Sequence, residues 1–147
     1  MGQLHFILQE YGHFEICESI INCIENKNPR NFFAWTPLYG AAWKGHVRIC
    51  KKLLKHAEEK NPRDNIGRTP LHMAAKSGHF EVCEVITNEI EDKNPKDDSG
   101  LTPLHYATNR GHVSICKAIM SNIEEKDPPS NDGITPSKLL MNYMGWN

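Results

Sequence analysis

Apolar and polar positions between residues 64 and 96 form two blocks, each with the spacing of a helix. The first block has a narrow apolar face of small side chains, which lets neighbouring helices approach closely: Leu71, Ala74 and Ala75. The second block has a stripe at i, i+1, i+3, i+4 and i+8: Val82, Cys83, Val85, Ile86 and Ile90. A stripe of this period is typical of an amphipathic α-helix with one buried face. The pattern therefore predicts two short helices.

Residues with special backbone preferences mark the ends of these helices. Thr69 can cap the first helix, and Pro70 suits its first turn because no N–H donor is needed there. Gly78 can end this helix in the left-handed conformation. Asn94-Pro95 stops the second helix, because the residue before a proline favours an extended path. Residues 64–68 have turn chemistry, so each unit is a turn followed by a helix–turn–helix.

Several residue types recur every 33 residues in one phase, so the unit is repeated along the chain. The recurring residues are Gly12, Gly45, Gly78 and Gly111, each before a histidine, Thr36, Thr69, Thr102 and Thr135, each before a proline, and Cys17, Cys50, Cys83 and Cys116. Neither helix of one unit can bury its apolar face alone, whereas stacked units share a continuous core. The period predicts an all-α repeat solenoid.

Residues 69–75 read T-P-L-H-M-A-A and residues 102–107 read T-P-L-H-Y-A, which resembles the T-P-L-H-x-A signature of the ankyrin-repeat family. The copy at 36–42 matches except that Tyr39 replaces the histidine. The resemblance covers nearly the whole chain. It implies stacked helix–turn–helix units with β-turn or hairpin fingers, and a concave face of fingers and first helices that binds a protein. The signature is specific for the fold and hardly specific for the partner.

The chain, 1–147, is expected to form one ankyrin-repeat domain with divergent ends. The expected units are an N-terminal partial repeat at 1–30, full repeats at 31–63, 64–96 and 97–129, and a truncated repeat at 130–147. The first unit lacks its finger and has a degraded first helix, whereas its second helix, 14–24, keeps the pattern. The last unit departs from the signature at Ser137-Lys138 and is rich in apolar residues. Either this end folds back over the last repeat, or the chain is a fragment of a longer array.

The end of the second helix also departs from the family. Residues 90–95 read I-E-D-K-N-P, where the resembling family has a sequence close to G-A-D-V-N. Because the glycine that usually ends the helix is absent, we expect the second helices to run longer or to end less sharply.

Partner contacts in the resembling family come from the fingers and the outer side of the first helix, where the repeats of this chain differ most. The candidate partner-binding residues at these positions are Phe32, Phe33, Trp35, Trp43, Lys44, Ile66, Arg68, Met73, Lys76, Leu101, Tyr106 and Arg110.

Four large aromatic residues crowd the first full repeat: Phe32, Phe33, Trp35 and Trp43. They are expected either to anchor a partner, since aromatic side chains dominate binding energies, or to cover the N-terminal repeat that lacks a finger. Four basic residues give the same face an excess of positive charge, with Asp98 as the main opposing charge: Lys44, Arg68, Lys76 and Arg110. This combination predicts a partner segment with an apolar or aromatic anchor followed by acidic residues.

Composition and charge narrow the class of protein. The formal net charge of −1 argues against a nucleic-acid binder, because such proteins carry a basic excess on one face. No apolar run approaches the roughly 20 residues of a membrane-spanning helix, and no signal-peptide pattern is present. The odd count of five cysteines fits a reducing compartment better than a disulfide framework. We expect an intracellular, cytoplasmic and monomeric protein.

No constellation in the sequence predicts a cofactor, a metal site or catalysis. Cysteines one repeat apart, at roughly 10 Å, are too distant for a disulfide or a zinc site. No histidine pair has the i, i+4 spacing of a helical zinc site, and no nucleophile or phosphate-binding motif appears. We therefore expect a module that binds another protein. The alternatives are an architectural spacer or fragment of a larger multidomain protein without a partner of its own, and an enzyme, which would need a polar pocket.

Overall fold

The structure, a computed structural model, describes residues 14–144 with the exception of 24 and 27. The described residues form helices and turns and contain no β-strand. In chain order the helices are α2 (Phe14–Cys23), α3 (Pro37–Lys44), α4 (Val47–His56), α5 (Pro70–Ser77), α6 (Phe80–Glu89), α7 (Pro103–Asn109), α8 (Val113–Ser121) and α9 (Pro136–Met144). The degraded first helix expected before residue 14 lies outside the described residues.

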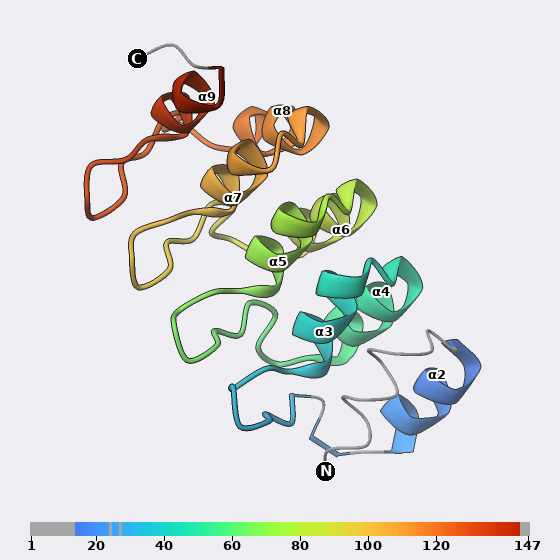
Figure 1. Ribbon diagram of the computed structural model, residues 1–147. Coiled ribbons are helices and arrows are strands. Elements are labelled where there is room, and N and C mark those ends of the chain that lie inside the picture. Colours follow the sequence, from blue (N-terminus) through green and yellow to red (C-terminus); the bar gives the residue numbers. More distant parts are fainter. Residues whose placement is uncertain (1–13, 24, 27, 145–147) are drawn as a thin grey trace.

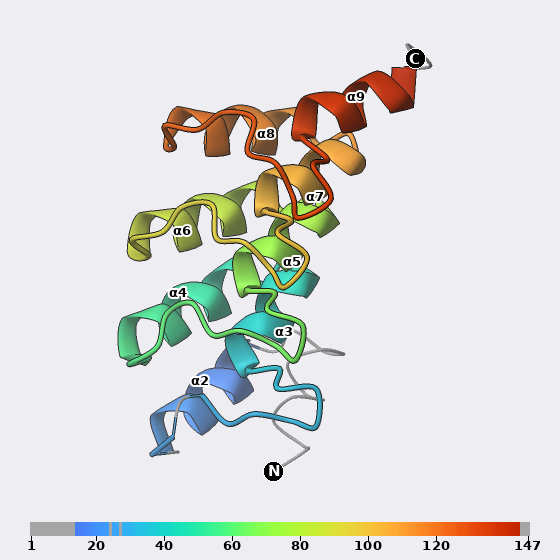
Figure 2. The ribbon, with the colours of Figure 1, turned by 90° about the vertical axis from the view of Figure 1, so that its left-hand side faces the viewer.

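The helices form two stacked rows, and the loops before the first helices project to one side as fingers (Figures 1 and 2). One row contains α3, α5, α7 and α9, and the other contains α2, α4, α6 and α8, with each helix packed against the next in its row. The pairs α3–α4, α5–α6 and α7–α8 join the rows. The all-α repeat solenoid predicted from the 33-residue period is therefore confirmed.

Small side chains let the two rows pack closely. The first helices contribute alanines that are fully buried: Ala41, Ala42, Ala74, Ala75 and Ala107. The second helices contribute larger side chains to the same core: Leu53, Leu54, Ile86, Ile115 and Ile119. Because these residues contact the units on either side, the core continues along the stack, and each unit is stabilised mainly by its neighbours.

The first helices begin and end at the residues that the sequence predicts. Thr36, Thr69 and Thr102 are N-caps followed by a proline. Gly45 and Gly78 follow α3 and α5 with φ of 78° and 81°, a left-handed conformation that glycine adopts without steric cost. These local signals determine the length of each first helix.

Helices α4 and α6 end sharply although no glycine follows them, which contradicts the expectation of longer or less sharp ends, whereas α8 ends less sharply, at Asn122 with ψ of 1°. Ala57 and Ile90, which follow α4 and α6, are already extended, with ψ of 133° and 151°. At the ends of α6 and α8, a lysine in the next loop satisfies the carbonyl groups that a C-terminal glycine motif would otherwise satisfy. Lys93 Nζ donates to the carbonyl oxygens of Thr87 and Ile90, and Lys126 makes the equivalent pair of bonds at the end of α8. An ammonium group there satisfies free carbonyl groups and interacts favourably with the helix dipole.

Each finger is closed by the side chain of its first residue. Oδ1 of Asp64 accepts hydrogen bonds from the backbone N–H groups of Ile66 and Arg68 at 3.0 and 2.9 Å. Asn31 and Asp97 make the equivalent bonds in their own fingers. A short carboxylate or amide side chain stabilises a tight turn in this way by accepting hydrogen bonds from the backbone N–H groups of the turn.

Neighbouring fingers are joined by backbone hydrogen bonds. The N–H groups of Asn65, Asp98 and Asn131 donate to the carbonyl oxygens of Phe33, Ile66 and Ser99, at 3.3, 3.2 and 3.0 Å. The fingers are therefore held in register with one another, which presents a preorganised row to the solvent.

The signature histidines connect each first helix to the next finger. The N–H of Thr69 donates to Nδ1 of His72 at 3.0 Å, and Nε2 of the same ring donates to the carbonyl oxygen of Leu101 at 3.0 Å. His105 makes the same connection to Ile134. Because Nδ1 accepts a hydrogen bond, the ring is neutral and carries its proton on Nε2. Burial is the main cause that lowers the pKa of His72 to about 4, and it lowers the pKa of His105 as well.

Candidate functional site

Aromatic rings of the first full repeat form a continuous chain from the finger to the end of α3. The ring centroids of Phe32 and Phe33 are 5.6 Å apart, those of Phe33 and Trp35 are 5.4 Å apart, and those of Trp35 and Trp43 are 5.6 Å apart. Phe32 is 91% exposed and Phe33 is 55% exposed, whereas the two tryptophans are half-buried. Rings at these separations attract one another. We call this group of four the aromatic chain.

Tyr39 supports the middle of the aromatic chain, at Trp35. Its ring is buried and stacks on Trp35 with centroids 5.1 Å apart. Its hydroxyl donates to Oδ2 of Asp64 at 2.8 Å. Burial, together with this bond to a carboxylate, raises the pKa of Tyr39 well above its ordinary value. The tyrosine that replaces the signature histidine therefore connects the aromatic chain to the second finger.

The excess of positive charge on this face is smaller than the sequence suggests, because Arg68 is already paired with Asp64. Its Nη2 lies 2.8 Å from Oδ2 of Asp64, its neighbour in the same finger. Although burial alone would raise the pKa of Asp64, hydrogen bonds from Arg68 and Tyr39 hold it below its ordinary value. The guanidinium of Arg68 therefore serves the finger itself and offers little net charge to a partner.

Three other cations remain at the surface of this face. Lys44 and Arg110 are exposed, and Lys76 is partly exposed. Nζ of Lys44 lies 5.2 Å from the ring centroid of Trp43, a distance at which a cation and an aromatic face attract each other. Asp98, the expected opposing charge, is exposed as well.

Met73 does not reach the surface, so the expectation that it contacts a partner is wrong. It is 4% exposed, on a helix that packs against both α3 and α7. Tyr106, the equivalent residue of α7, is half-buried and meets the ring of His72 edge to face at 5.3 Å. Its hydroxyl donates to Oδ2 of Asp97 at 2.9 Å, and burial is the main cause that raises its pKa to about 12.

The remaining candidates lie on the next two fingers. Ile66 is exposed at the second finger, and Leu101 is partly exposed at the third. The structure thus brings the four aromatic residues and Lys44 together on the first full repeat, and the other candidates lie on the following two repeats.

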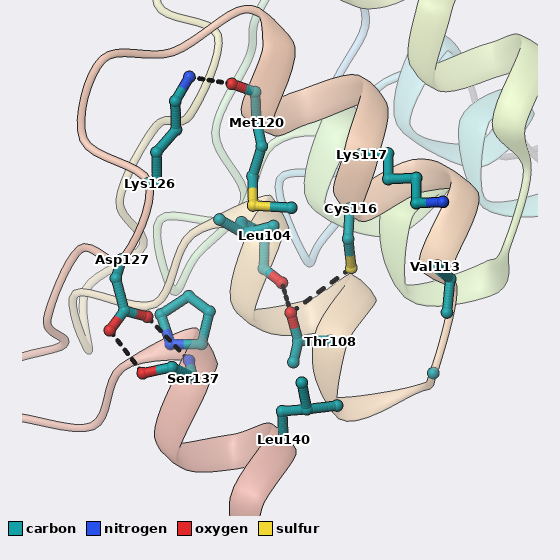
Figure 3. A pocket seen from close by; sticks show the side chains of 12 residues that line it. Leu104, Thr108, Val113, Cys116, Lys117, Met120, Lys126, Asp127, Ser137 and Leu140 are labelled. Carbon is teal, nitrogen blue, oxygen red and sulfur yellow. Dashed lines mark hydrogen bonds between the residues drawn. The ribbon is translucent and has the colours of Figure 1, made fainter.

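An apolar groove between α7, α8 and α9 was not singled out from the sequence (Figure 3). It encloses about 400 Å³ and is lined mainly by apolar side chains, among them Leu104, Cys116, Met120 and Leu140. Val113 on its rim is 62% exposed, and Leu140 is 49% exposed. The sequence signal that could have indicated this groove is the departure of the unit at 130–147 from the signature, which falls within α9.

Most of the cysteines are buried, as expected of residues in the apolar stripes of helices. Cys17, Cys50 and Cys83 are buried, Cys116 is partly exposed and Cys23 is exposed. Burial is the main cause that raises the pKa of the Cys50 and Cys83 thiols to about 12. Within the described part of the chain, no group of three or more His, Cys, Asp or Glu side chains is placed to hold a metal ion. None of the described helices has the length and apolar character needed to cross a bilayer.

Comparison with protein families agrees with the period and the geometry. A family model described as Ankyrin repeats (3 copies) matches residues 4–97, and one described as Ankyrin repeat matches residues 99–128. The chain belongs to the ankyrin-repeat family. No curated protein matches its sequence at a significant level. Ankyrin repeats are in general protein–protein interaction modules, so protein binding is the general role of the family to which this chain belongs.

Proposed function

We propose that this ankyrin-repeat chain binds a protein partner through the face made by its fingers and first helices. The observation that carries the proposal is the aromatic chain, whose outer members, Phe32 and Phe33, are large, apolar and exposed on adjoining positions. Aromatic side chains bury a large area and lose few rotamers, so they dominate the energetics of many interfaces.

Preorganisation of the face supports the same function. Oδ1 of Asn31 accepts the N–H groups of Phe33 and Trp35, both at 2.9 Å. The side-chain amide of Asn65 in the next finger donates to the carbonyl oxygen of Phe32 at 3.1 Å. A face held in this way loses little conformational entropy when a partner docks, so more of the contact energy appears as affinity.

The charges of the face favour a partner segment with an apolar anchor followed by carboxylates. Lys44 adjoins the aromatic chain, and Lys76 and Arg110 continue the positive charge on the following repeats. Arg68 is left out of this set because Asp64 neutralises it. Asp98 would repel a carboxylate near the third finger, so the acidic part of the partner is expected beside Lys44 and Lys76.

The test is quantitative capture of partners from cell lysate with the chain, with Phe32→Ser plus Phe33→Ser, and with Phe80→Ser. Phe80 is a matched control because it is an exposed aromatic residue on α6, in the row of second helices. We expect a partner that the chain and the control variant retain and the double variant loses. Circular dichroism must show equal helix content in all three proteins.

Three results would count against the proposal. Equal capture by the double variant would remove the aromatic chain from the interface. A lower unfolding temperature in the double variant, with capture unchanged, would show that these residues cover the N-terminal repeat. An absence of any captured partner would favour the architectural role.

A further inference from the structure

The groove between α7, α8 and α9 has the place in the stack that a second helix occupies in the preceding units. Its residues Leu104, Gly111 and Cys116 are equivalent, one period earlier, to Leu71, Gly78 and Cys83. In that earlier unit the equivalent space is filled, because α8 packs against α6 and α7 packs against α5. Helix α8 is therefore an example, from the same chain, of a helix that fits a groove of this shape.

At the two filled junctions whose glycine the structure describes, a histidine covers that glycine. A Cβ built on Gly45 would lie 2.6 Å from Nδ1 of His79, and one on Gly78 would lie 2.8 Å from Cε1 of His112. At Gly111 nothing lies within 4 Å. The groove is therefore open at the position where an imidazole from the next unit would lie.

The same two histidines each donate a hydrogen bond across their junction. Nε2 of His79 donates to the carbonyl oxygen of Trp43 at 3.0 Å, and Nε2 of His112 donates to that of Lys76 at 3.2 Å. The equivalent acceptor beside the groove is the carbonyl oxygen of Asn109. An occupant that begins with histidine would thus find both a space and an acceptor.

The charge of the second helices alternates along their row. One position carries Glu18 in α2, Lys51 in α4, Glu84 in α6 and Lys117 in α8. In the α2–α4 contact, Glu18 accepts from Lys52 Nζ at 2.9 Å, and Lys60 in the loop after α4 pairs with Glu89 of α6 at 2.6 Å. Lys117 lines the groove at the position of Glu18, so the complementary group is a carboxylate placed where α4 has Lys52.

We propose that this groove binds an acidic amphipathic helix of a partner protein, preceded by a histidine that docks over Gly111. The apolar stripe of that helix packs on Cys116 and Met120, and its carboxylate pairs with Lys117. This second docking surface lies beside α8, between α7 and α9 at the last unit, whereas the aromatic chain lies at α3. It stands independently of the function proposed for the finger face.

One difference from the filled junctions shapes the expected fit. Leu140 stands where α3, α5 and α7 have a fully buried alanine: Ala41, Ala74 and Ala107. Its larger side chain takes up space on the α9 side of the groove. The occupant is therefore expected to contact α8 more closely than α6 contacts α4 or α8 contacts α6. Leu140→Ala is therefore expected to strengthen binding, and Leu140→Asp to weaken it.

The probe is a peptide of residues 78–90 of this chain, with Val85→Glu to place a carboxylate opposite Lys117. A hydrocarbon link between positions 80 and 84, both exposed in α6, keeps the short peptide helical. The protein is the full chain with ¹³C-labelled methionine methyl groups. Met120 lines the groove, and the buried Met73 of α5 is the internal control.

We expect saturable shifts of the Met120 methyl signal and none of the Met73 signal. Lys117→Glu should weaken binding about threefold to tenfold, as expected for one partly exposed ion pair turned repulsive. A second peptide, with Lys in place of Glu at position 85, should reverse this preference and bind the Lys117→Glu protein better. Gly111→Ala should weaken the binding of both peptides, because its Cβ takes the place of the histidine ring.

Three outcomes would overturn the proposal. One is an unchanged Met120 signal at millimolar peptide. A second is binding that ignores both the Lys117→Glu change and the peptide charge. The third is a Met120 shift that appears without peptide as the protein concentration rises, which would identify a second copy of the chain as the occupant.

Discussion

The imidazole of His79 occupies the space beside Gly45 in which a side chain would otherwise stand. Its Nδ1 lies 2.6 Å from the position of a Cβ on Gly45, and its Nε2 donates to the carbonyl oxygen of Trp43 at 3.0 Å. The glycine and the histidine of the recurring Gly-His pair thus each contact a neighbouring unit. The histidine of one unit packs on the glycine of the preceding unit.

Gly45→Ala is expected to lower the free energy of unfolding by about 3 kcal/mol. Roughly 1–2 kcal/mol comes from placing alanine at φ of 78°, and the rest from displacing the His79 ring and its hydrogen bond. Urea denaturation followed by circular dichroism measures the change.

Gly111→Ala is the matched control, since its φ of 71° is also left-handed but nothing lies within 4 Å of its Cβ position. Only the conformational cost, about 1 kcal/mol, is expected here. Equal losses in the two variants would show that the histidine contact contributes nothing to stability.

The buried His72 makes stability depend on pH. Its pKa is lowered to about 4, whereas it is about 6.5 in an unfolded chain. Below pH 6.5 the unfolded chain therefore binds more protons, and the folded state loses stability as the pH falls. We expect a loss of about 3 kcal/mol from this residue between pH 7 and pH 4.

His72→Gln is the variant that isolates this effect. Glutamine at the third helical position can reach the N-cap backbone, as in a capping box, but does not titrate. Urea denaturation at pH 7, 5.5 and 4 should show a shallower loss in the variant than in the parent chain. Parallel slopes would mean that His72 does not carry the pH dependence.

Asp64→Asn is expected to lower the free energy of unfolding by about 2 kcal/mol, because the partly buried Arg68 loses its counter-ion and Tyr39 loses a charged acceptor. Asp97→Asn, at the equivalent position without an arginine partner, should cost less than about 1 kcal/mol. Asn31 already closes its finger with an amide, so the turn itself tolerates asparagine. A larger loss from Asp97→Asn than from Asp64→Asn would contradict this account.

Thiol reactivity should follow burial along the cysteine stripe. Cys23 is exposed and should react first with a thiol reagent at pH 8, and Cys116 should follow slowly. Cys50 and Cys83, with pKa values raised to about 12, should react only on unfolding, since both access and thiolate are lacking. Mass spectrometry after short labelling assigns the sites, and Cys23→Ser should abolish the fast phase.

Much of the fold could be predicted because its determinants act locally. Thr69, Pro70 and Gly78 begin and end a helix through their own backbone preferences, wherever the unit is placed. Repetition of these signals every 33 residues made the stack the only way to bury the apolar stripes. The sharp end of α6 was not predicted, because Lys93 caps this helix from a loop that the helix pattern does not include.

The candidate site could be predicted only in part, because exposure depends on neighbouring units. Met73 and Tyr106 hold the same position in successive repeats, yet one is buried and the other half-exposed. Arg68 looked available for a partner until the structure paired it with Asp64. Likewise, the groove at Leu140 exists only where three helices meet.

The sequence by itself determined the repeat, its length and the positions that vary, since these follow from short-range backbone chemistry and the helical period. The tertiary structure alone decided which variable side chains face solvent, which charges are already neutralised and where Gly111 is left uncovered. Those properties belong to contacts between units 33 residues apart, and no single unit contains the information that sets them.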